Sequence, residues 1–288
     1  MTDLPWHADP ASSGLSAVVA LVVSGTAASH TAVFRERGAL RVTVVLKATF
    51  RLVHEGHAQV IAPAPIVRAD RVTPEGRLAD AGELAPLLPS AGVLLSGHAC
   101  APRGRTAAAM SVRLGLSGSE GPLLDKVLHV VGDRVSGSQA PPRPFDRMPL
   151  VYERAYGGRG HPDNPVGMGA DGTAPPNILY PAYPGIPAGF GPVAPAWASR
   201  RRFLQGEPPP AGGLLSERVD PRFFQAAPAD QQTRFLQGDE WIVLDGFDPD
   251  RPRVASSCRG CAARRASSAA SRRRSRSSRT RSSSTPTR

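Results

Sequence analysis

Cysteine is scarce in this chain, which has only Cys100, Cys258 and Cys261 among its 288 residues. So few cysteines exclude a disulfide framework and favour a reducing compartment. No apolar run approaches the roughly 20 residues that a membrane-spanning helix needs. The N-terminal sequence MTDLPWHADP also lacks the charged and then apolar pattern of a signal peptide. We therefore expect a cytoplasmic protein that makes no membrane contact.

Catalytic and cofactor motifs are missing as well. The sequence contains no GxSxG elbow, HExxH, GxxxxGK[ST] or strand-linked GxGxxG motif. The CRGC motif in the tail has the spacing of half a zinc site, but the nearest histidine, His161, is far upstream. We therefore expect no cofactor and no enzymatic activity. The alternative is a hydrolase or metal-dependent enzyme that uses the loop at residues 153–171, with Glu153, His161 and Asp163 as its acids, bases or ligands.

An excess of basic charge is absent from most of the chain. The formal net charge is +11, yet ten of the 35 Lys and Arg side chains, and no acidic one, lie in residues 255–288. The rest of the chain keeps 25 basic against 24 acidic side chains, so it offers no reason to expect a nucleic-acid surface. Of the 34 tail residues, 21 are Ser or Arg, and no core can form from them. We predict one mainly β domain over residues 1–254 and a disordered tail over residues 255–288.

The tail has two interpretations. As an arginine-rich arm it would neutralise phosphates and bind RNA or DNA with a steep dependence on salt. Alternatively, it is an inert or out-of-frame continuation, because G/C-rich codons for ASSCRGCAARR, translated two bases later, encode an apolar sequence such as ELVPGLRG. We favour the second interpretation, and nucleic-acid binding through the tail stays open as an alternative function.

Helical stripes are missing too, whereas runs of apolar and β-branched residues are frequent. Such residues suit strands, and the runs lie at residues 16–24, 40–52, 93–99, 109–116, 126–132 and 241–244. In the second run Val42, Val44 and Leu46 form an apolar face opposite a mixed one. Asp220, placed as a cap before a proline, predicts one short helix within residues 220–232. We therefore predict a mainly β fold, an antiparallel sandwich or barrel-like sheet with few short helices.

A glycine- and proline-rich segment occupies residues 141–195, where 22 of 55 residues are Gly or Pro. That content excludes helices and long strands. Unlike a flexible linker, however, the segment also carries large side chains: Phe145, Met148, Leu150, Tyr152, Tyr156, Ile178, Leu179, Tyr180, Tyr183, Ile186 and Phe190. We expect an irregular segment packed over a sheet. Just before two glycines, the charged pair Glu153 and Arg154 is expected to tie the following loop down.

Several longer motifs follow one another in a characteristic order. They are VLKATF (45–50), VLLSGHACAP (93–102), HVVGDR (129–134), PFDRMPLVYERAYGG (144–158), NPVGMG (164–169), PPNI (175–178), PAGFGPVAPAW (187–197), RFFQAAPADQQ (222–232) and FLQGDEWIVLDGF (235–247). In this order they resemble domain of unknown function family 2169, a bacterial family found beside type VI secretion genes. The resemblance spans most of residues 20–250.

This resemblance implies a non-enzymatic adaptor or chaperone whose partner is a protein, namely a secreted effector or its spike-tip carrier. The family has no established catalytic residues, so none is carried over. Its domain normally continues with apolar sequence where this chain has the Ser/Arg tail, in keeping with the out-of-frame hypothesis. The candidates for partner binding or for structural roles within the motifs are Tyr152, Glu153, Arg154, Tyr156, Gly157, Gly158, Asn164, Pro165, Gly167, Phe190, Phe223, Phe224 and Gln225.

Overall fold

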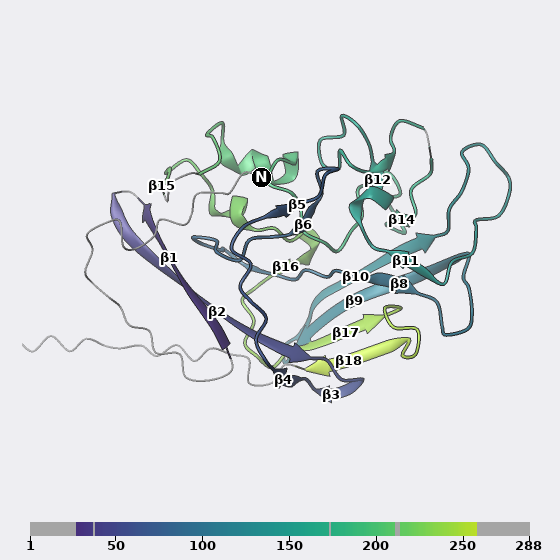
Figure 1. Cartoon of the computed structure of the whole chain (residues 1–288), viewed down its shortest axis with the longest axis horizontal. Helices are drawn as coiled ribbons and strands as arrows, with labels where there is room; N and C mark the ends of the chain where they lie inside the picture. Colours follow the sequence, from purple (N-terminus) through teal and green to yellow (C-terminus); the bar gives the residue numbers. More distant parts are fainter. Residues whose placement is uncertain (1–26, 37, 173, 211–213, 258–288) are drawn as a thin grey trace, which may run out of the picture.

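The computed structural model describes residues 27–257 apart from residues 37, 173 and 211–213. This part of the chain has a mainly β fold with several sheets and one short α-helix, which confirms the predicted fold class. Figure 1 shows a long β-hairpin at one end of the molecule and a larger sheet at the other. The strand predicted at residues 16–24 and the tail beyond residue 257 lie outside the described residues.

The larger sheet has six strands in the order β14-β10-β9-β17-β18-β3. Every neighbouring pair is antiparallel except β18 and β3, which run parallel. The strands are β3 (Glu55–His57), β9 (Ala109–Gly118), β10 (Gly121–Val131), β14 (Ile178–Leu179), β17 (Trp241–Asp245) and β18 (Arg253–Ser257). The predictions at residues 109–116, 126–132 and 241–244 are thereby confirmed. Period-two alternation turns Val112, Leu114, Leu128 and Val130 to one face, where all four are fully buried.

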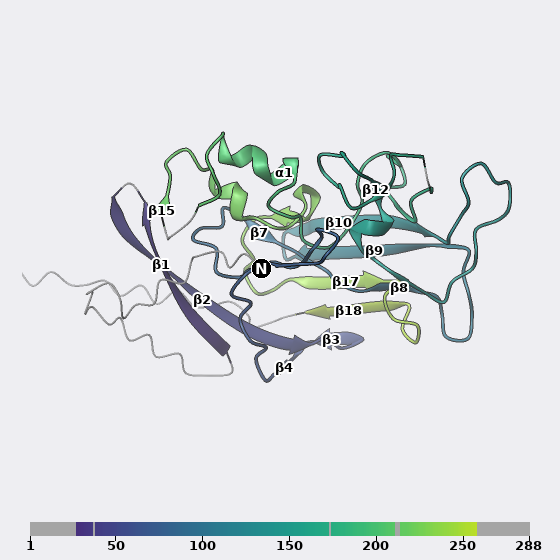
Figure 2. The same cartoon turned by 45° about the horizontal axis from the view of Figure 1, so that its top comes forward.

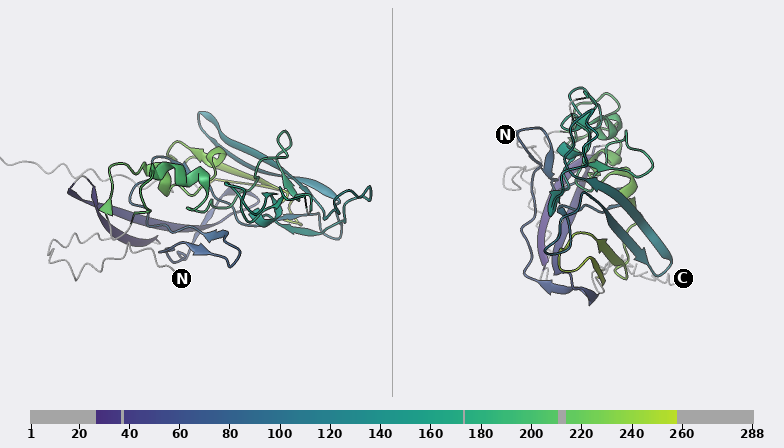
Figure 3. Two further views of the ribbon diagram at one scale, coloured as in Figure 1. Left: turned by 90° about the horizontal axis from the view of Figure 1, so that it is seen from above. Right: turned by 90° about the vertical axis from the view of Figure 1, so that its right-hand side faces the viewer.

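The second sheet is built on the hairpin of β1 (Ala27–Glu36) and β2 (Ala39–Arg51), with the short strands β4 (Gln59–Ile61) and β15 (Leu214–Leu215) at its edges. β2 confirms the prediction at residues 40–52. The sequence analysis missed β1, because its residues AASHTAVFRE include only two large apolar side chains. Figures 2 and 3 show the hairpin projecting away from the larger sheet. The two sheets are joined by residues 55–61, since β3 pairs with β18 and β4 pairs with β2.

The strand predicted at residues 93–99 is wrong over most of its length. Strands flank it instead, as β7 (Ala91–Gly92) and β8 (His98–Cys100). The backbone N–H of Val93 donates to the carbonyl of Gln231, and that of Leu95 donates to the carbonyl of Phe190. Because successive backbone groups bond to different segments, no single neighbouring strand accompanies this run.

The single helix predicted within residues 220–232 is two 3₁₀ turns, η4 (Pro221–Phe224) and η5 (Ala229–Gln231). Asp220 caps the first turn as expected, since its carboxylate accepts the backbone N–H of Arg222 at 2.9 Å. Pro228 precedes the second turn and has no N–H to continue a helix. The chain therefore restarts after each short turn.

A further strand, β18, follows β17 and continues to Ser257, past the predicted start of the tail at residue 255. Ser256 and Ser257 are fully buried, and the Ser257 hydroxyl lies 2.6 Å from Nδ1 of His57. Two serines that we assigned to the tail by composition are thus part of the larger sheet.

Shorter elements complete the described part of the chain. The strands are β5 (Arg71–Val72), β6 (Leu78–Asp80), β11 (Arg147–Pro149), β12 (Tyr156–Gly157), β13 (Met168–Gly169) and β16 (Gln232–Thr233). The helical turns are η2 (Tyr152–Arg154), α1 (Ala198–Arg201) and η3 (Arg202–Leu204). Among the described residues, no helix is long and apolar enough to span a membrane.

The glycine- and proline-rich segment is packed against the larger sheet, as predicted. One core cluster joins strand residues such as Val112 and Leu128 to side chains of the segment that include Phe145, Tyr152 and Phe190. Two of the large side chains in the segment depart from the expectation, because Tyr183 and Ile186 are exposed. The segment therefore contributes to the core through most, but not all, of its apolar residues.

Candidate functional site

An apolar surface on the second sheet is partly exposed to solvent. Along β2 the side chains of even-numbered residues point to one face, and Val33 of β1 lies directly opposite Val42 on that face. The members of this surface are between 41% and 52% exposed: Val33, Leu40, Val42, Val44, Leu46 and Val60. We call these six residues the β2 apolar face. Alternation predicted that β2 has an apolar face, but the sequence analysis assigned no function to it.

The opposite face of β2 is covered by the chain between residues 63 and 87. The Thr43 hydroxyl donates to the carbonyl of Pro86 at 2.5 Å, and the ammonium of Lys47 lies 2.7 Å from the Glu83 carboxylate. The Thr49 hydroxyl accepts the backbone N–H of Ala64 at 2.7 Å. The polar side chains of the mixed face satisfy backbone groups of this irregular segment. The segment therefore packs on the mixed face, and the apolar face is left exposed.

The charged pair Glu153 and Arg154 is engaged with neighbouring segments of the fold. Glu153 accepts a hydrogen bond from Nε of Arg77 at 2.7 Å, and Arg154 donates to Asp133 at 2.9 Å and to the Asn177 side chain at 3.0 Å. These contacts hold η2 between β6 and the end of β10. Arg154 keeps the pKa of Asp133 below its usual range, mainly through this hydrogen bond. Both charges therefore fix η2, which precedes the loop.

Asn164 organises the loop that follows. Its fully buried side-chain amide donates to the carbonyls of Tyr152 and Tyr156, each at 2.9 Å. A Cβ at Gly157 would lie 2.3 Å from the backbone carbonyl oxygen of Asn164. A Cβ at Gly167 would lie 2.3 Å from the side-chain amide nitrogen of Asn164. The glycines are required because the backbone passes directly over Asn164.

The same loop contains the groups that we considered for a metal or hydrolytic site. Nδ1 of His161 accepts the backbone N–H groups of Asp163 and Asn164, and the Asp163 carboxylate accepts the N–H of Ser199 at 2.6 Å. The ring of Tyr156 lies edge-on to His161. Within the described residues, no group of three or more His, Cys, Asp or Glu side chains could hold a metal ion.

Gly158 and Pro165 belong to the same turns, with the Gly158 N–H donating to the carbonyl of Asn164.

The remaining predicted residues lie elsewhere. Phe190 is fully buried in the main core, edge-on to Phe247. Phe223 belongs to a second, smaller cluster with Phe34 of β1, and Phe224 packs against that cluster. The buried Gln225 amide donates to the carbonyl of Ser90 at 3.0 Å. The structure thus distributes the predicted residues over the loop and two cores, and does not gather them into one site.

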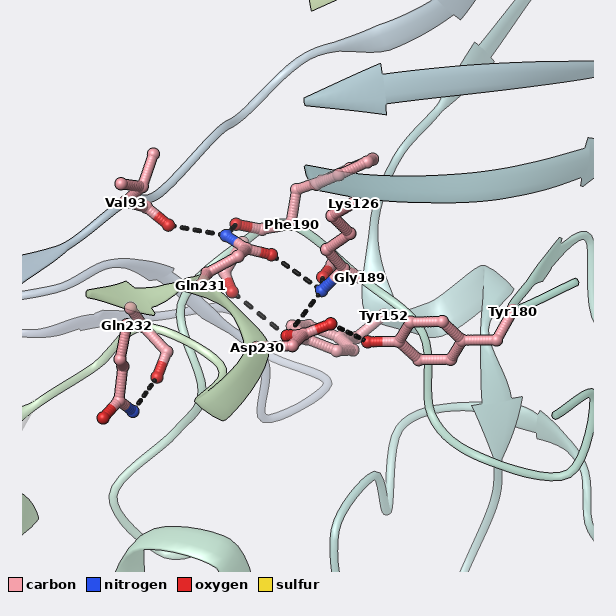
Figure 4. A network of polar contacts seen from close by, with 11 residues as sticks. Val93, Lys126, Tyr152, Tyr180, Gly189, Phe190, Asp230, Gln231 and Gln232 are labelled. Carbon is pink, nitrogen blue, oxygen red and sulfur yellow. Dashed lines mark hydrogen bonds and ion pairs between the residues drawn. The ribbon is translucent and has the colours of Figure 1, made fainter. Parts of the chain in front are cut away.

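A buried lysine that the sequence analysis did not single out connects these regions (Figure 4). The Lys126 ammonium donates to the carbonyl of Gly189 at 2.6 Å, to Asp230 at 2.9 Å and to the side-chain oxygen of Gln231 at 2.7 Å. Burial lowers the pKa of Lys126 to about 8, although Asp230 acts in the opposite direction. Lys126 is therefore still mostly protonated at neutral pH.

The signal in the sequence for this network was the position of Lys126 on the apolar face of its strand. Leu124, Leu128 and Val130 share its face of β10 and are buried. Tyr180 completes the network by donating to Asp230 at 2.5 Å, and burial together with this hydrogen bond raises the pKa of the Tyr180 hydroxyl. With all three ammonium hydrogens used, Lys126 anchors the segment at residues 189–231 to the sheet.

Comparison with known proteins connects the chain to one family. Residues 37–283 match the model of a family described as an uncharacterized protein conserved in bacteria, DUF2169. No curated protein and no solved structure matches the chain. The family match begins directly after β1 and extends beyond β18 into the Ser/Arg tail, whose out-of-frame origin stays a prediction. The chain therefore belongs to the bacterial family DUF2169.

Proposed function

We propose that this protein is a non-enzymatic adaptor or chaperone that binds a type VI secretion effector or a spike-tip protein. The observation that carries the proposal is the β2 apolar face, six large aliphatic side chains left about half exposed on one side of a sheet. A contiguous apolar patch on a protein surface is typical of a protein-binding site. The nature of the partner comes from the resemblance to the adaptors of this family.

The energetics of the β2 apolar face suit a protein partner. Removing the remaining exposed area of one such valine or leucine from water contributes about 1 kcal/mol. The face therefore supplies several kcal/mol when a partner with a complementary apolar surface covers it. Lys47 of β2 points to the other side and is already paired with Glu83, so it does not oppose this burial.

The test is co-expression of the full chain with each protein encoded beside its gene, followed by co-purification and gel filtration. We expect a stable complex with a secreted effector or a spike-tip protein. The double variant Val42→Lys/Val44→Lys should lose the complex, because two charges then lie at the centre of the interface. A matched control is Val135→Lys, since Val135 is 75% exposed in a loop away from β2.

Two outcomes would overturn the proposal. In the first, no effector or spike-tip protein encoded nearby forms a complex with the folded chain. In the second, a complex forms but the Val42→Lys/Val44→Lys variant retains it as fully as the Val135→Lys variant does, which would exclude the β2 apolar face as the binding surface.

A further inference from the structure

A groove of about 620 Å³ lies on the other side of the hairpin from the β2 apolar face. Its apolar walls are formed by Leu84, Leu204, Phe223, Phe224 and the prolines at 208–210. Phe34 of β1 packs with Leu204 and Phe223 in one cluster, and Pro86 at the groove accepts the hydrogen bond from Thr43. Since both strand residues point away from the β2 apolar face, the two surfaces can bind different parts of one partner.

Two exposed arginines lie at this groove without a carboxylate partner. Arg68 and Arg201 both line it, and neither forms an ion pair within the part of the chain that the structure describes. The two acidic groups of the groove are already engaged. The Asp70 carboxylate accepts the backbone N–H of Gly82 at 2.7 Å, and Glu207 lies 3.6 Å from Arg218. With Arg200, three arginines face two carboxylates in the lining, so the groove offers a net positive charge to a ligand.

A third arginine, Arg200, also lines the groove and is only 8% exposed. Its guanidinium donates to the carbonyl of Phe223 from Nε and Nη2, at 2.9 and 2.8 Å, and to the carbonyl of Val193 from Nη1 at 2.7 Å. Burial lowers the pKa of Arg200 to about 10, with Asp70 acting against it. A guanidinium has five N–H donors, so two of them have no acceptor among the described residues.

We propose that this groove binds an extended peptide segment of the partner protein in which acidic side chains alternate with aliphatic ones. An apolar centre with a charged rim is the usual arrangement of a protein interface. The acidic side chains would pair with Arg68 and Arg201 on the rim, and the aliphatic ones would contact the phenylalanine and leucine walls. The inference rests on the proposed function in that the segment belongs to the partner protein.

The experiment measures fluorescence anisotropy of labelled peptides with the purified full chain. One peptide alternates leucine with glutamate, a second alternates leucine with glutamine, and a third alternates leucine with lysine. We expect the glutamate peptide to bind about tenfold more tightly than the glutamine peptide, and the lysine peptide more weakly still. The double variant Arg68→Glu/Arg201→Glu should weaken binding of the glutamate peptide by at least about tenfold.

The control is Arg105→Glu, which reverses an exposed charge outside the groove and should leave binding unchanged. Equal binding of the glutamate and glutamine peptides would overturn the inference, as would no binding of the glutamate peptide or full binding by the Arg68→Glu/Arg201→Glu variant. Val42→Lys/Val44→Lys should bind the peptide normally. Failure of the wild-type chain to bind the glutamate peptide therefore counts against the groove alone. Loss of the partner complex in Val42→Lys/Val44→Lys concerns only the β2 apolar face.

Discussion

The Lys126 ammonium lies 2.9 Å from the Asp230 carboxylate and so connects β10 to η5. The two partners differ in burial, because the Lys126 side chain is 3% exposed and the Asp230 side chain 41%. The desolvation free energy of the pair consequently falls mostly on protonated Lys126, and its three hydrogen bonds offset only part of it.

This asymmetry predicts a pH dependence of stability. The pKa of Lys126 is about 8 in the fold, compared with 10.5 for an ordinary lysine. Between these values the unfolded chain retains a proton that the folded protein has released, so the Lys126 contribution to the free energy of unfolding increases with pH. We expect the stability of the wild type relative to Lys126→Met to rise by about 3 kcal/mol from about pH 7 to pH 10.5.

Urea unfolding of both proteins over this pH range provides the measurement. Leu128→Met is the control, because it alters the same buried face of β10 without removing a titratable group. The prediction would be contradicted if the free energy of unfolding of the wild type, relative to that of Lys126→Met, stays constant or declines with pH.

Gly167→Ala should destabilise the fold. The new Cβ would lie 2.3 Å from the Asn164 amide nitrogen and 2.7 Å from the carbonyl oxygen of Ala155, so the loop must move and Asn164 must shift from its hydrogen bonds. We expect a loss of about 3 kcal/mol in thermal or urea unfolding. Gly185→Ala is the matched control, since its Cβ would meet nothing within 4 Å, and a similar loss in both variants would refute the explanation.

The ion pair between Arg77 and Glu153 should contribute measurably to stability. Its side chains are 23% and 27% exposed, so water screens the pair less than a surface pair. A double-mutant cycle with Arg77→Ala and Glu153→Ala should give a coupling of about 1 kcal/mol. The same cycle on the exposed pair Arg71 and Asp80 should give close to zero, and equal couplings in the two cycles would contradict the prediction.

Exposure of the β2 apolar face predicts that polar substitutions there cost little stability. Val42→Thr keeps a β-branched side chain in a strand and places its hydroxyl in water, so we expect a change below about 0.5 kcal/mol. Val112→Thr makes the same change at a fully buried position of β9 and should cost about 2 kcal/mol. Equal losses in urea unfolding would show that Val42 is buried in solution.

β10 illustrates how far the sequence was informative. A run of apolar and β-branched residues predicted a strand at residues 126–132, and the backbone of a strand turns every second side chain to the same face. The sequence alone shows that Lys126 shares its face of the strand with Leu128 and Val130. Its acceptors were not visible in the sequence, since Gly189, Asp230 and Gln231 come from segments far along the chain and reach Lys126 only in the folded protein.

β2 illustrates the opposite case. Its sequence determined a strand with one apolar and one mixed face, as well as the mainly β character of the whole domain, through local preferences of the side chains. Only the tertiary structure decided that the apolar face stays outside. The segment at residues 63–87 satisfies its backbone groups on Thr43 and Thr49 and pairs Glu83 with Lys47, so it covers the mixed face and not the apolar one. Local periodicity therefore determined strand β2, and the pairing of distant polar groups determined which of its faces is left exposed.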